Sequence, residues 1–390
     1  MNILFVANKS ETGGAPKSLQ SLILKLKENN NITVITPKKG IIYGFCKKNN
    51  IKVVRTFHEQ FLIYSGNTTL KKYIRKLLIP ILKIRHYMLN KVSMYIVKRN
   101  IDIDNIEIIH TNFYRDDIGG LLAKKYNKIH IVHLREFGNL DYDCLSLVKN
   151  KIKYLDKYTT KFIAISEAIK KHYTNQGIQA EKITLIYNGI ENLNISRHIN
   201  RNDNRLKMIL VGNITEEKGQ MDVLQSLLLL DKERLEKISV DFYGQADTLY
   251  RKKIEKFILK NDLSNNVNIH EYVDNIYDIL KNYDIGLMCS KAEAFGRVTV
   301  EYMSAGLLTI ASDCGANPEI IDNRVDGFLY DKNNLKTFTD ILNYIFDNDC
   351  EEIRLNAIKK VENNFTYIKN ANMVNDLYLR CIKECCNNEK

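Results

Sequence analysis

Short runs of β-branched and other apolar residues alternate with longer helical stretches along the chain, and this alternation restricts the fold more than any other feature. Strands that are apolar at nearly every position and are separated by helices are typical of parallel sheets covered on both faces. The runs in the first half are Ile3–Ala7, Ile32–Thr36, Ile51–Arg55, Ile106–His110, Ile129–Leu134, Phe162–Ile165 and Ile183–Ile186. Those in the second half are Met208–Val211, Ser239–Tyr243, Val267–His270, Ile285–Met288 and Leu308–Ala311. Two such series predict an α/β chain with two doubly wound, Rossmann-like domains.

A polar stretch separates the two series of strands. Residues 191–206 bring Asn, Asp, Arg and His close together, which is typical of a linker. We therefore expect an N-terminal domain over residues 1–190, a linker over 191–206 and a C-terminal domain over 207–367. The remaining segment, 368–390, begins with an amphipathic pattern that predicts a helix over about Ile368–Ile382.

Charge is distributed unevenly between the two halves. Residues 1–190 carry 32 Lys and Arg against 14 Asp and Glu, a net charge of 32 − 14 = +18, and residues 191–390 carry the remaining 26 and 32, a net charge of 26 − 32 = −6. The basic half is expected to meet an anionic partner: a nucleic acid, a membrane surface or a phosphorylated substrate. The hydrophobic content of 45% excludes a disordered chain.

Neither a targeting segment nor a membrane span is expected. The first eight residues lack a charged region and a long apolar region, so they predict a buried strand rather than a signal peptide. No apolar run approaches the roughly 18 residues that a membrane-spanning helix needs. The eight cysteines include no C-x-x-C pair, so neither zinc nor a disulfide framework is expected, and a reducing cytoplasmic compartment fits.

The segment Cys289–Gly306, C-S-K-A-E-A-F-G-R-V-T-V-E-Y-M-S-A-G, carries the strongest chemical signal. It predicts a loop after the strand Ile285–Met288 and then a helix that starts near Arg297. Glu293 and Glu301 are separated by seven residues, with Glu293 in the loop at the carboxyl end of a strand, where open α/β sheets bind ligands. The amide groups at such a helix start favour a diphosphate without a metal ion.

This segment resembles the E-x7-E signature of the retaining nucleotide-sugar glycosyltransferases of family 4, which have the GT-B fold: two Rossmann-like domains facing an interdomain cleft. Further similar pieces occur in the family's order along nearly the whole chain. They are the glycine loop Gly13-Gly14-Ala15, the strand–turn–helix Phe162–Lys170, the crossover Ile186–Ile190, the phosphate-binding turn Val211–Gly219 and the nucleobase loop Glu271–Asp274. The resemblance also implies that the C-terminal helix returns to the N-terminal domain.

The roles that the resemblance implies concern a donor such as a UDP- or GDP-linked sugar. Glu301 would bind the ribose hydroxyls, and Glu293 would face the donor sugar and steady an oxocarbenium-like centre. Lys218 would neutralise the diphosphate in place of a metal ion. The amides of Phe295 and Gly296 would hold sugar hydroxyls and those of Arg297 and Val298 the phosphate. The remaining implied donor-binding residues are Gly13, Gly14, Asn213 and Val273.

This chain departs from the family pattern at two places. Glu191 stands where the crossover usually has Asp, and Asn213 stands where the phosphate turn usually has Arg, so Arg297 is a candidate for the missing cation. In the N-terminal domain, His133 is the candidate for the family's histidine near the donor sugar, with Arg135 as the alternative in that register. Ordinary structural explanations remain open: a buried structural histidine for His133 and a solvated surface lysine for Lys218.

The expected activity is transfer of a hexosyl group from a nucleotide sugar to an acceptor hydroxyl with retained anomeric configuration, in surface polysaccharide or glycolipid synthesis. The family is thought to use the leaving phosphate oxygen to deprotonate the acceptor. No metal or other cofactor is expected, since Asp102-Ile-Asp104 and Asp141-Tyr-Asp143 lack the context of a nucleotide-binding D-x-D motif. The alternatives are a non-catalytic GT-B partner subunit and a GT-B sugar-nucleotide epimerase. No nucleic-acid-binding module is apparent.

The stretch between Glu59 and Asp102 contains no acidic residue but nine basic ones interleaved with apolar groups. This pattern predicts a basic amphipathic helix, split into two at Pro80. Such a face would place the protein peripherally on an anionic membrane at the cytoplasmic side, with a lipid-linked saccharide as acceptor. The alternative is a solvated helix that covers the core of the N-terminal domain. The basic residues are Lys71, Lys72, Arg75, Lys76, Lys83, Arg85, Lys91, Lys98 and Arg99.

Overall fold

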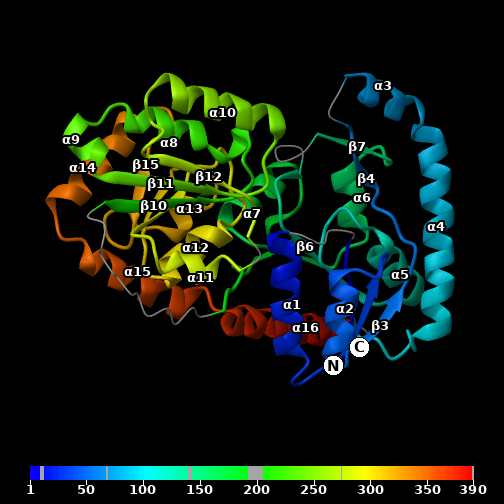
Figure 1. Cartoon of the computed structure of the whole chain (residues 1–390). Coiled ribbons are helices and arrows are strands. Elements are labelled where there is room, and N and C mark those ends of the chain that lie inside the picture. Colours follow the sequence, from blue (N-terminus) through cyan, green and yellow to red (C-terminus); the bar gives the residue numbers. More distant parts are fainter. Residues whose placement is uncertain (9–12, 67–68, 139–142, 192–204, 274, 389–390) are drawn as a thin grey trace. The chain divides into compact units, whose positions relative to one another are not determined.

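The computed structural model describes residues 1–8, 13–66, 69–138, 143–191, 205–273 and 275–388, which form two compact units (Figure 1). Unit 1 comprises Met1–Gly189 with Tyr367–Lys390, and unit 2 comprises Ile190–Thr366. Most of the expected linker lies outside the described residues, and its last residue, Leu206, is the first residue of a strand. The C-terminal segment belongs to unit 1.

Unit 1 is a seven-stranded parallel sheet in the order β3-β2-β1-β5-β6-β8-β9, with a separate antiparallel pair, β4 and β7. Its strands are β1 (Asn2–Val6), β2 (Asn31–Thr36), β3 (Lys52–Arg55), β4 (Leu62–Tyr64), β5 (Ile108–Thr111), β6 (Ile129–Leu134), β7 (Cys144–Ser146), β8 (Lys161–Ala164) and β9 (Ile183–Leu185). Its helices are α1 (Gly14–Leu26), α2 (Ile41–Lys48), α3 (Thr69–Leu77), α4 (Ile79–Asn100), α5 (Ile118–Tyr126), α6 (Lys151–Lys157), α7 (Glu167–Asn175) and α16 (Tyr367–Asn388).

Unit 2 is a six-stranded parallel sheet in the order β12-β11-β10-β13-β14-β15. Its strands are β10 (Leu206–Val211), β11 (Ile238–Tyr243), β12 (Val267–His270), β13 (Ile285–Met288), β14 (Leu308–Ser312) and β15 (Phe328–Tyr330). Its helices are α8 (Gln220–Leu227), α9 (Lys232–Glu236), α10 (Thr248–Lys260), α11 (Tyr277–Leu280), α12 (Arg297–Ser304), α13 (Asn317–Ile320), α14 (Lys336–Asp347) and α15 (Glu351–Asn364). Two further 3₁₀ turns are Ala180–Lys182 in unit 1 and Glu216–Lys218 in unit 2.

Both sheets confirm the predicted parallel α/β architecture. Each of the twelve predicted strands is present with bounds within two residues of those expected, and the helix pair splits as expected at Pro80, which occupies the first turn of α4. Three short strands, β4, β7 and β15, were not predicted. Each has only three residues, which is too short for a periodic pattern to be recognised.

Alternating strand residues build two apolar layers on the sheet of unit 1. Ile3 and Phe5 pack with α1, α2 and α16, whereas Leu4 and Val6 pack with α4 and α5. The helix α16 therefore belongs to the core of unit 1, to which it contributes Ala371, Val374, Leu377, Tyr378 and Cys381. Burial of both sheet faces explains why these strands are apolar at nearly every position.

Unit 2 has the same construction. Met208 and Leu210 face the layer of α8, α10 and α14, and Ile209 faces a smaller cluster that includes Tyr302 of α12. Tyr302 is fully buried, and its hydroxyl accepts a hydrogen bond of 2.7 Å from the amide of Val211. This bond ties α12 to the carboxyl end of β10.

Gly286 in β13 provides a test of this packing. A Cβ atom at Gly286 would lie 2.2 Å from Cγ of Tyr302, whereas one at Gly44, in the exposed part of α2, would meet nothing within 4 Å. We expect Gly286→Ala to destabilise unit 2 by about 1–3 kcal/mol through overpacking. Gly44→Ala should instead stabilise unit 1 by up to about 1 kcal/mol because alanine is the better helix former. Urea unfolding would measure both, and a Gly286→Ala protein as stable as the wild type would contradict the packing described here.

Candidate active site

The candidate site of unit 2 lies where the strand order reverses. β10 pairs with β11 on one side and with β13 on the other, and all three strands are parallel. The turn after β10 and the loop after β13 therefore meet at one edge of the sheet, at a topological switch point, where open α/β sheets bind ligands. The turn is Gly212–Gly219, and the loop is Cys289–Gly296.

Backbone contacts join the turn to the loop. Gly219 has a φ of +73°, and a Cβ atom there would lie 2.1 Å from the carbonyl oxygen of Cys289. The amide of Lys291 donates to the carbonyl of Glu217 at 2.9 Å, and Lys291 Nζ pairs with the Glu216 carboxylate at 3.0 Å. Glycine at position 219 is thus needed both for the left-handed turn and for the close approach of the loop.

Two of the predicted site residues form an ion pair across this junction. Lys218 Nζ lies 3.1 Å from Glu293 Oε2 and donates to Ser290 Oγ at 3.3 Å. The Glu293 side chain is 17% exposed and that of Lys218 33% exposed, so the pair lies at the surface but is partly shielded from solvent. The carbonyl of Glu293 accepts from the amide of Ala316 at 2.8 Å, which anchors the loop to the segment after β14. The structure thus brings together a carboxylate and an ammonium group that are far apart in sequence.

The start of α12 contains the next group of predicted residues. Gly296 is its N-cap with φ +79°, and the amides of Arg297 and Val298 lie in its first turn. Phe295 is buried, and its ring meets that of Phe365 edge-on at 6.0 Å. These contacts hold the loop while the helix begins at the residue expected from the sequence.

Glu301 lies one turn further along α12 and is nearly buried, with a side chain 6% exposed. Its Oε1 accepts from Arg297 Nε at 2.8 Å and from the Tyr277 hydroxyl at 2.7 Å. Burial and the adjacent Glu301 carboxylate raise the pKa of Tyr277 to about 12, so this hydroxyl stays a hydrogen-bond donor at neutral pH. Arg297 Nε is thus held by the Glu301 carboxylate.

Asn213 and Val273 are exposed, in contrast to the residues of the loop and α12. The backbone carbonyl of Asn213 accepts a hydrogen bond from Gln220 Nε2 at 3.0 Å. Val273 lies in the loop that follows β12. The next residue, Asp274, lies outside the described residues. Beside this loop the rings of Tyr243 and His270 stack at 4.3 Å, a flat aromatic pair that the sequence did not indicate.

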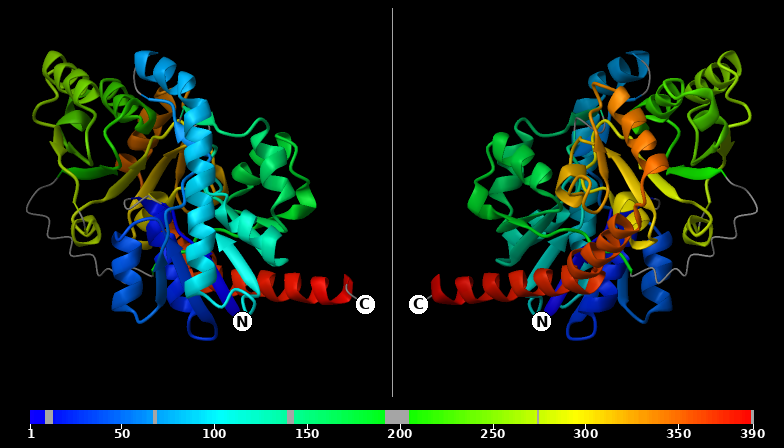
Figure 2. Two further views of the ribbon diagram at one scale, coloured as in Figure 1. Left: turned by 90° about the vertical axis from the view of Figure 1, so that its right-hand side faces the viewer. Right: turned by 90° about the vertical axis from the view of Figure 1, so that its left-hand side faces the viewer.

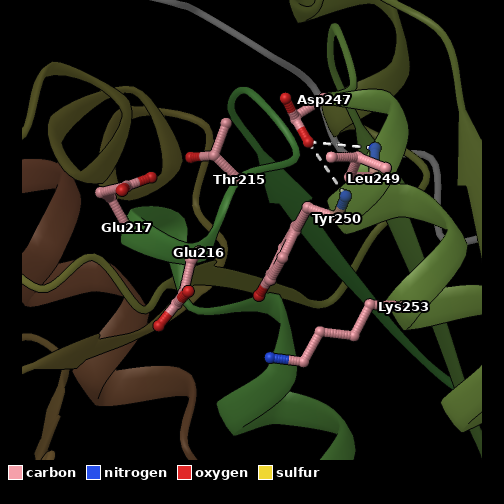
Figure 3. Close-up of a pocket in the computed structure, with 7 residues that line it drawn as sticks. All are labelled: Thr215, Glu216, Glu217, Asp247, Leu249, Tyr250 and Lys253. Carbon is pink, nitrogen blue, oxygen red and sulfur yellow. Dashed lines mark hydrogen bonds between the residues drawn. The ribbon is translucent and has the colours of Figure 1, made fainter. Parts of the chain in front are cut away.

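A pocket of about 400 Å³ lies between the turn after β10 and the start of α10 (Figure 3). Asp247 caps α10 there by accepting hydrogen bonds from the amides of Leu249 and Tyr250, and the lining contains three carboxylates and one lysine. The predicted site residues do not line this pocket, and its acidic lining disfavours a diphosphate. Its lining residues are Thr215, Glu216, Glu217, Asp247, Leu249, Tyr250 and Lys253.

The predicted site residues of unit 1 lie at the carboxyl ends of its central strands. Gly13 is the N-cap of α1 with φ +95°, and Gly14 begins that helix. His133 lies near the end of β6 and is completely buried, with Nδ1 2.7 Å from His110 Nε2 and 3.3 Å from a terminal guanidinium nitrogen of Arg135. Burial, reinforced by Arg135, lowers the pKa of His133 well below its usual value, so this imidazole is neutral. His133 and Arg135, weighed as alternatives from the sequence, are direct neighbours.

Comparison with known proteins assigns the family. The model of the glycosyl transferases group 1 matches residues 192–364, and that of Glycosyltransferase Family 4 matches residues 80–192. The chain belongs to the family 4 glycosyltransferases. The two matches together run from α4 to the end of α15 and so include part of unit 1 and nearly all of unit 2.

Individual relatives of this family 4 chain are distant in sequence. The Staphylococcus aureus capsular polysaccharide biosynthesis glycosyltransferase CapH is 25% identical over 222 residues, which are 55% of this chain and 62% of the relative. The Escherichia coli UDP-Gal:alpha-D-GlcNAc-diphosphoundecaprenol alpha-1,3-galactosyltransferase is 23% identical over 75% of this chain and 79% of its own length. For CapH, the chain thus covers less than two thirds of the relative.

Solved structures show that the fold is GT-B. Anabaena Alr3699/HepE in complex with UDP has a TM-score of 0.76 and 18% identity, with 97% of this chain and 99% of that chain covered. The complex of the same protein with UDP-glucose has a TM-score of 0.73, with 97% of this chain and 99% of that chain covered. At this identity the likeness concerns the fold.

Sequence reasoning missed the polar partners that hold the predicted residues. Tyr277 donates a hydrogen bond to Glu301, and Asn112 accepts one from Arg135. Their spacing carries no motif, because each lies on a different element from its partner. Only the strand order brings them into contact.

The buried pair of Arg297 and Glu301 leads to a stability prediction. Arg297→Met removes the guanidinium and leaves the buried Glu301 carboxylate without this cation, so we expect unit 2 to lose about 3 kcal/mol of unfolding free energy. The double variant Arg297→Met/Glu301→Gln should recover most of that loss because the buried charge is gone. Urea unfolding of the wild type and both variants measures the effect. Equal stability of the single and double variants would contradict a net cost of the unpaired carboxylate.

Proposed function

We propose that this chain is a retaining glycosyltransferase that moves a hexosyl group from a nucleotide sugar to an acceptor hydroxyl in surface polysaccharide or glycolipid synthesis. The observation that carries the proposal is the contact of Lys218 with Glu293 at the switch point of unit 2, next to the start of α12. The relatives CapH, of capsular polysaccharide biosynthesis, and the galactosyltransferase acting on a diphosphoundecaprenol-linked sugar support the polysaccharide or glycolipid context. The UDP-glucose complex of the Anabaena neighbour supports a UDP-linked donor.

The proposed roles of the two glutamates follow from how deeply each side chain is buried. Glu301 is held inside unit 2 by Arg297 and Tyr277, which leaves its Oε2 as the oxygen to receive a ribose hydroxyl. Glu293 lies nearer the surface and would stabilise positive charge developing on the donor sugar. Lys218 and the first turn of α12 would stabilise the negative charge of the departing diphosphate. A phosphate oxygen of that leaving group would take the proton of the acceptor hydroxyl, with attack from the same face.

Glu293→Gln tests the chemistry separately from binding. The isosteric amide removes the negative charge, so we expect turnover to fall by at least about 100-fold, or about 2.7 kcal/mol of barrier, while UDP affinity stays within a few-fold. Glu301→Ala should instead weaken UDP binding about tenfold or more because the ribose loses its acceptor. Calorimetric titration with UDP and UDP release from UDP-glucose measure the two effects. Wild-type turnover of Glu293→Gln would refute its role.

We further propose that the reaction needs no metal ion, because Lys218 and the α12 start supply the positive charge. Activity should then survive excess EDTA. Among the residues that the structure describes, no group of three or more His, Cys, Asp or Glu side chains is arranged to hold a metal ion. Loss of activity in EDTA that Mg²⁺ or Mn²⁺ restores would refute this part of the proposal and direct attention to the two Asp-x-Asp sequences.

We also propose that the helices α3 and α4 bind an anionic membrane surface and that the acceptor is lipid-linked. The α4 side chains that face unit 1 are mostly polar: His86, Asn90 and Ser93, with Val97. His86 Nε2 and Asn90 Nδ2 contact the Asp117 carboxylate at 3.0 and 2.9 Å. In the left view of Figure 2, α4 faces the viewer along its length. Polar contacts, together with Val97 in the apolar core, therefore attach this helix to unit 1.

The outward side of both helices is apolar and basic. Ile84 is 66% exposed, and the further exposed apolar side chains are Leu70, Tyr73, Ile74, Leu77, Leu78, Ile81, Tyr87, Met88, Val92 and Tyr95. A helix that turns its apolar side chains away from the protein core is suited to insertion at a lipid interface, with lysine and arginine at the headgroups. Within the described residues no helix is long and apolar enough to cross a membrane.

Co-sedimentation with vesicles tests the surface. Binding should increase with phosphatidylglycerol content and decrease with salt. Replacing Lys71, Lys72, Arg75 and Lys76 with Ser should weaken binding at least about tenfold, whereas the matched change of Lys252, Lys253, Lys256 and Lys260 on α10 should have little effect. Equal binding of both variants, or binding that ignores lipid charge, would leave a solvated helix as the explanation of this surface.

A further inference from the structure

Lys332 follows β15 and places its ammonium group at the carboxyl edge of the unit 2 sheet. Its Nζ pairs with the carboxylate of Asp222, in the first turn of α8, and donates a hydrogen bond of 2.8 Å to the carbonyl oxygen of Cys289, directly after β13. The side chain of Lys332 is only 14% exposed and that of Asp222 21% exposed. One nearly buried ammonium group therefore links α8, the end of β13 and the segment after β15.

The Asp222 carboxylate also has a second donor. The Tyr330 hydroxyl donates to Asp222 Oδ2 at 3.3 Å. Burial, reinforced by the neighbouring Cys289 and Asp222, raises the pKa of Tyr330, so this hydroxyl keeps its proton. The backbone amide of Lys332 lies 3.4 Å from Asp313 Oδ1, in the segment after β14. Because charge-assisted hydrogen bonds are stronger than neutral ones, these contacts restrict where the connected segments can lie.

Both partners of this ammonium group belong to the two segments that form the candidate site or lie directly beside them. The amide of Asp222 donates to the carbonyl of Gly219 at 3.0 Å, and Gly219 directly follows Lys218. Cys289 begins the loop that contains Glu293. The turn and the loop are therefore joined by the contacts of two lysines, one of which is Lys218 in its 3.1 Å pair with Glu293.

A further side-chain link between the turn and the loop is exposed to solvent. Lys291 Nζ pairs with the Glu216 carboxylate at 3.0 Å, but the two side chains are 52% and 63% exposed. Such exposed pairs contribute little to stability. The nearly buried contacts of Lys332 are therefore better suited to keep the two segments at a constant separation.

We propose that Lys332 is a positioning residue, whose ammonium group holds the turn and the loop at the separation at which Lys218 contacts Glu293. The consequence for catalysis rests on the proposed function, in which these two side chains face the diphosphate and the donor sugar. A displacement of about 1 Å at such groups can lower a rate about 100-fold. The described contacts of Lys332 do not include Glu301 or the first turn of α12, so turnover depends on Lys332 more than nucleotide binding does.

Kinetics of UDP release from UDP-glucose by the full-length protein test this role. We expect Lys332→Met to lower kcat at least about tenfold while KM for UDP-glucose stays within about threefold. Lys332→Arg, which restores donors for the carboxylate and the carbonyl, should recover most of kcat. The matched control is Lys360→Met, because Lys360 is 16% exposed and pairs with Asp322 and Asp326, outside the candidate site. This control should lower stability but leave kcat unchanged. Wild-type kcat in Lys332→Met, or an equal loss in Lys360→Met, would overturn the proposal.

A double-mutant cycle with Glu293→Gln separates an effect through this glutamate from a general loss of structure. Once the ion pair of Lys218 with Glu293 is lost, adding Lys332→Met should lower kcat by no more than about threefold further. A further loss as large as the one that Lys332→Met causes in the wild type would mean that Lys332 does not act through this pair.

Amide hydrogen exchange of the ligand-free protein tests the same role without turnover. The amide of Lys291 bonds the loop to the turn at 2.9 Å, and that of Ala316 bonds the segment after β14 to the loop at 2.8 Å. Lys332→Met should speed the exchange of both amides at least about threefold, and Lys360→Met should not. Unchanged exchange in Lys332→Met would overturn the proposal. If the wild type releases no UDP from UDP-glucose, the proposed function fails, while these two amides still decide whether Lys332 holds the turn and the loop together.

Discussion

The parallel pairing of β10 with β13 is the constraint on which the candidate active site depends. Because the chain leaves β10 toward β11 and returns to β13 on the opposite side, the two following segments meet at one sheet edge without a strand between them. Gly219 makes this meeting close enough for the turn to contact the carbonyl of Cys289, and Lys218 then reaches Glu293. An ion pair between residues 75 positions apart thus follows from strand order.

The two carboxylates of the E-x7-E segment have different environments for a structural reason. Glu293 is in a loop at the sheet edge, where it keeps partial access to solvent, whereas Glu301 is in α12, whose other side packs on the sheet through Tyr302. A buried carboxylate is stable only when it is paired and hydrogen-bonded, and Arg297 and Tyr277 meet that need. The same segment therefore supplies one carboxylate suited to binding and one suited to contact with a reacting group.

Unit 1 uses polar contacts in its interior in two ways. The hydrogen bonds that run from Tyr378 through His110 to His133 join α16 to the central strands, so the helix is tied to the sheet by hydrogen bonds as well as by apolar packing. The contacts of His86 and Asn90 with Asp117 hold α4 through its polar side. Val97 of α4 joins the apolar core, but many other apolar residues of this helix remain exposed.

The sequence by itself determined the fold class. Strands buried on both faces must be apolar at almost every position, and such runs can be recognised directly in the sequence. It also determined the loop and helix around Glu293 and Glu301, since Gly296 and the apolar run before it act locally. Tertiary structure alone decided which groups meet. Arg297 contacts Glu301. His133 contacts both His110 and Arg135, although the sequence offered His133 and Arg135 only as alternatives. Tertiary structure also decided that α4 buries three polar side chains beside Val97 and leaves many apolar ones exposed. These contacts depend on strand order and on the orientation of side chains from separate elements, which no local periodicity encodes.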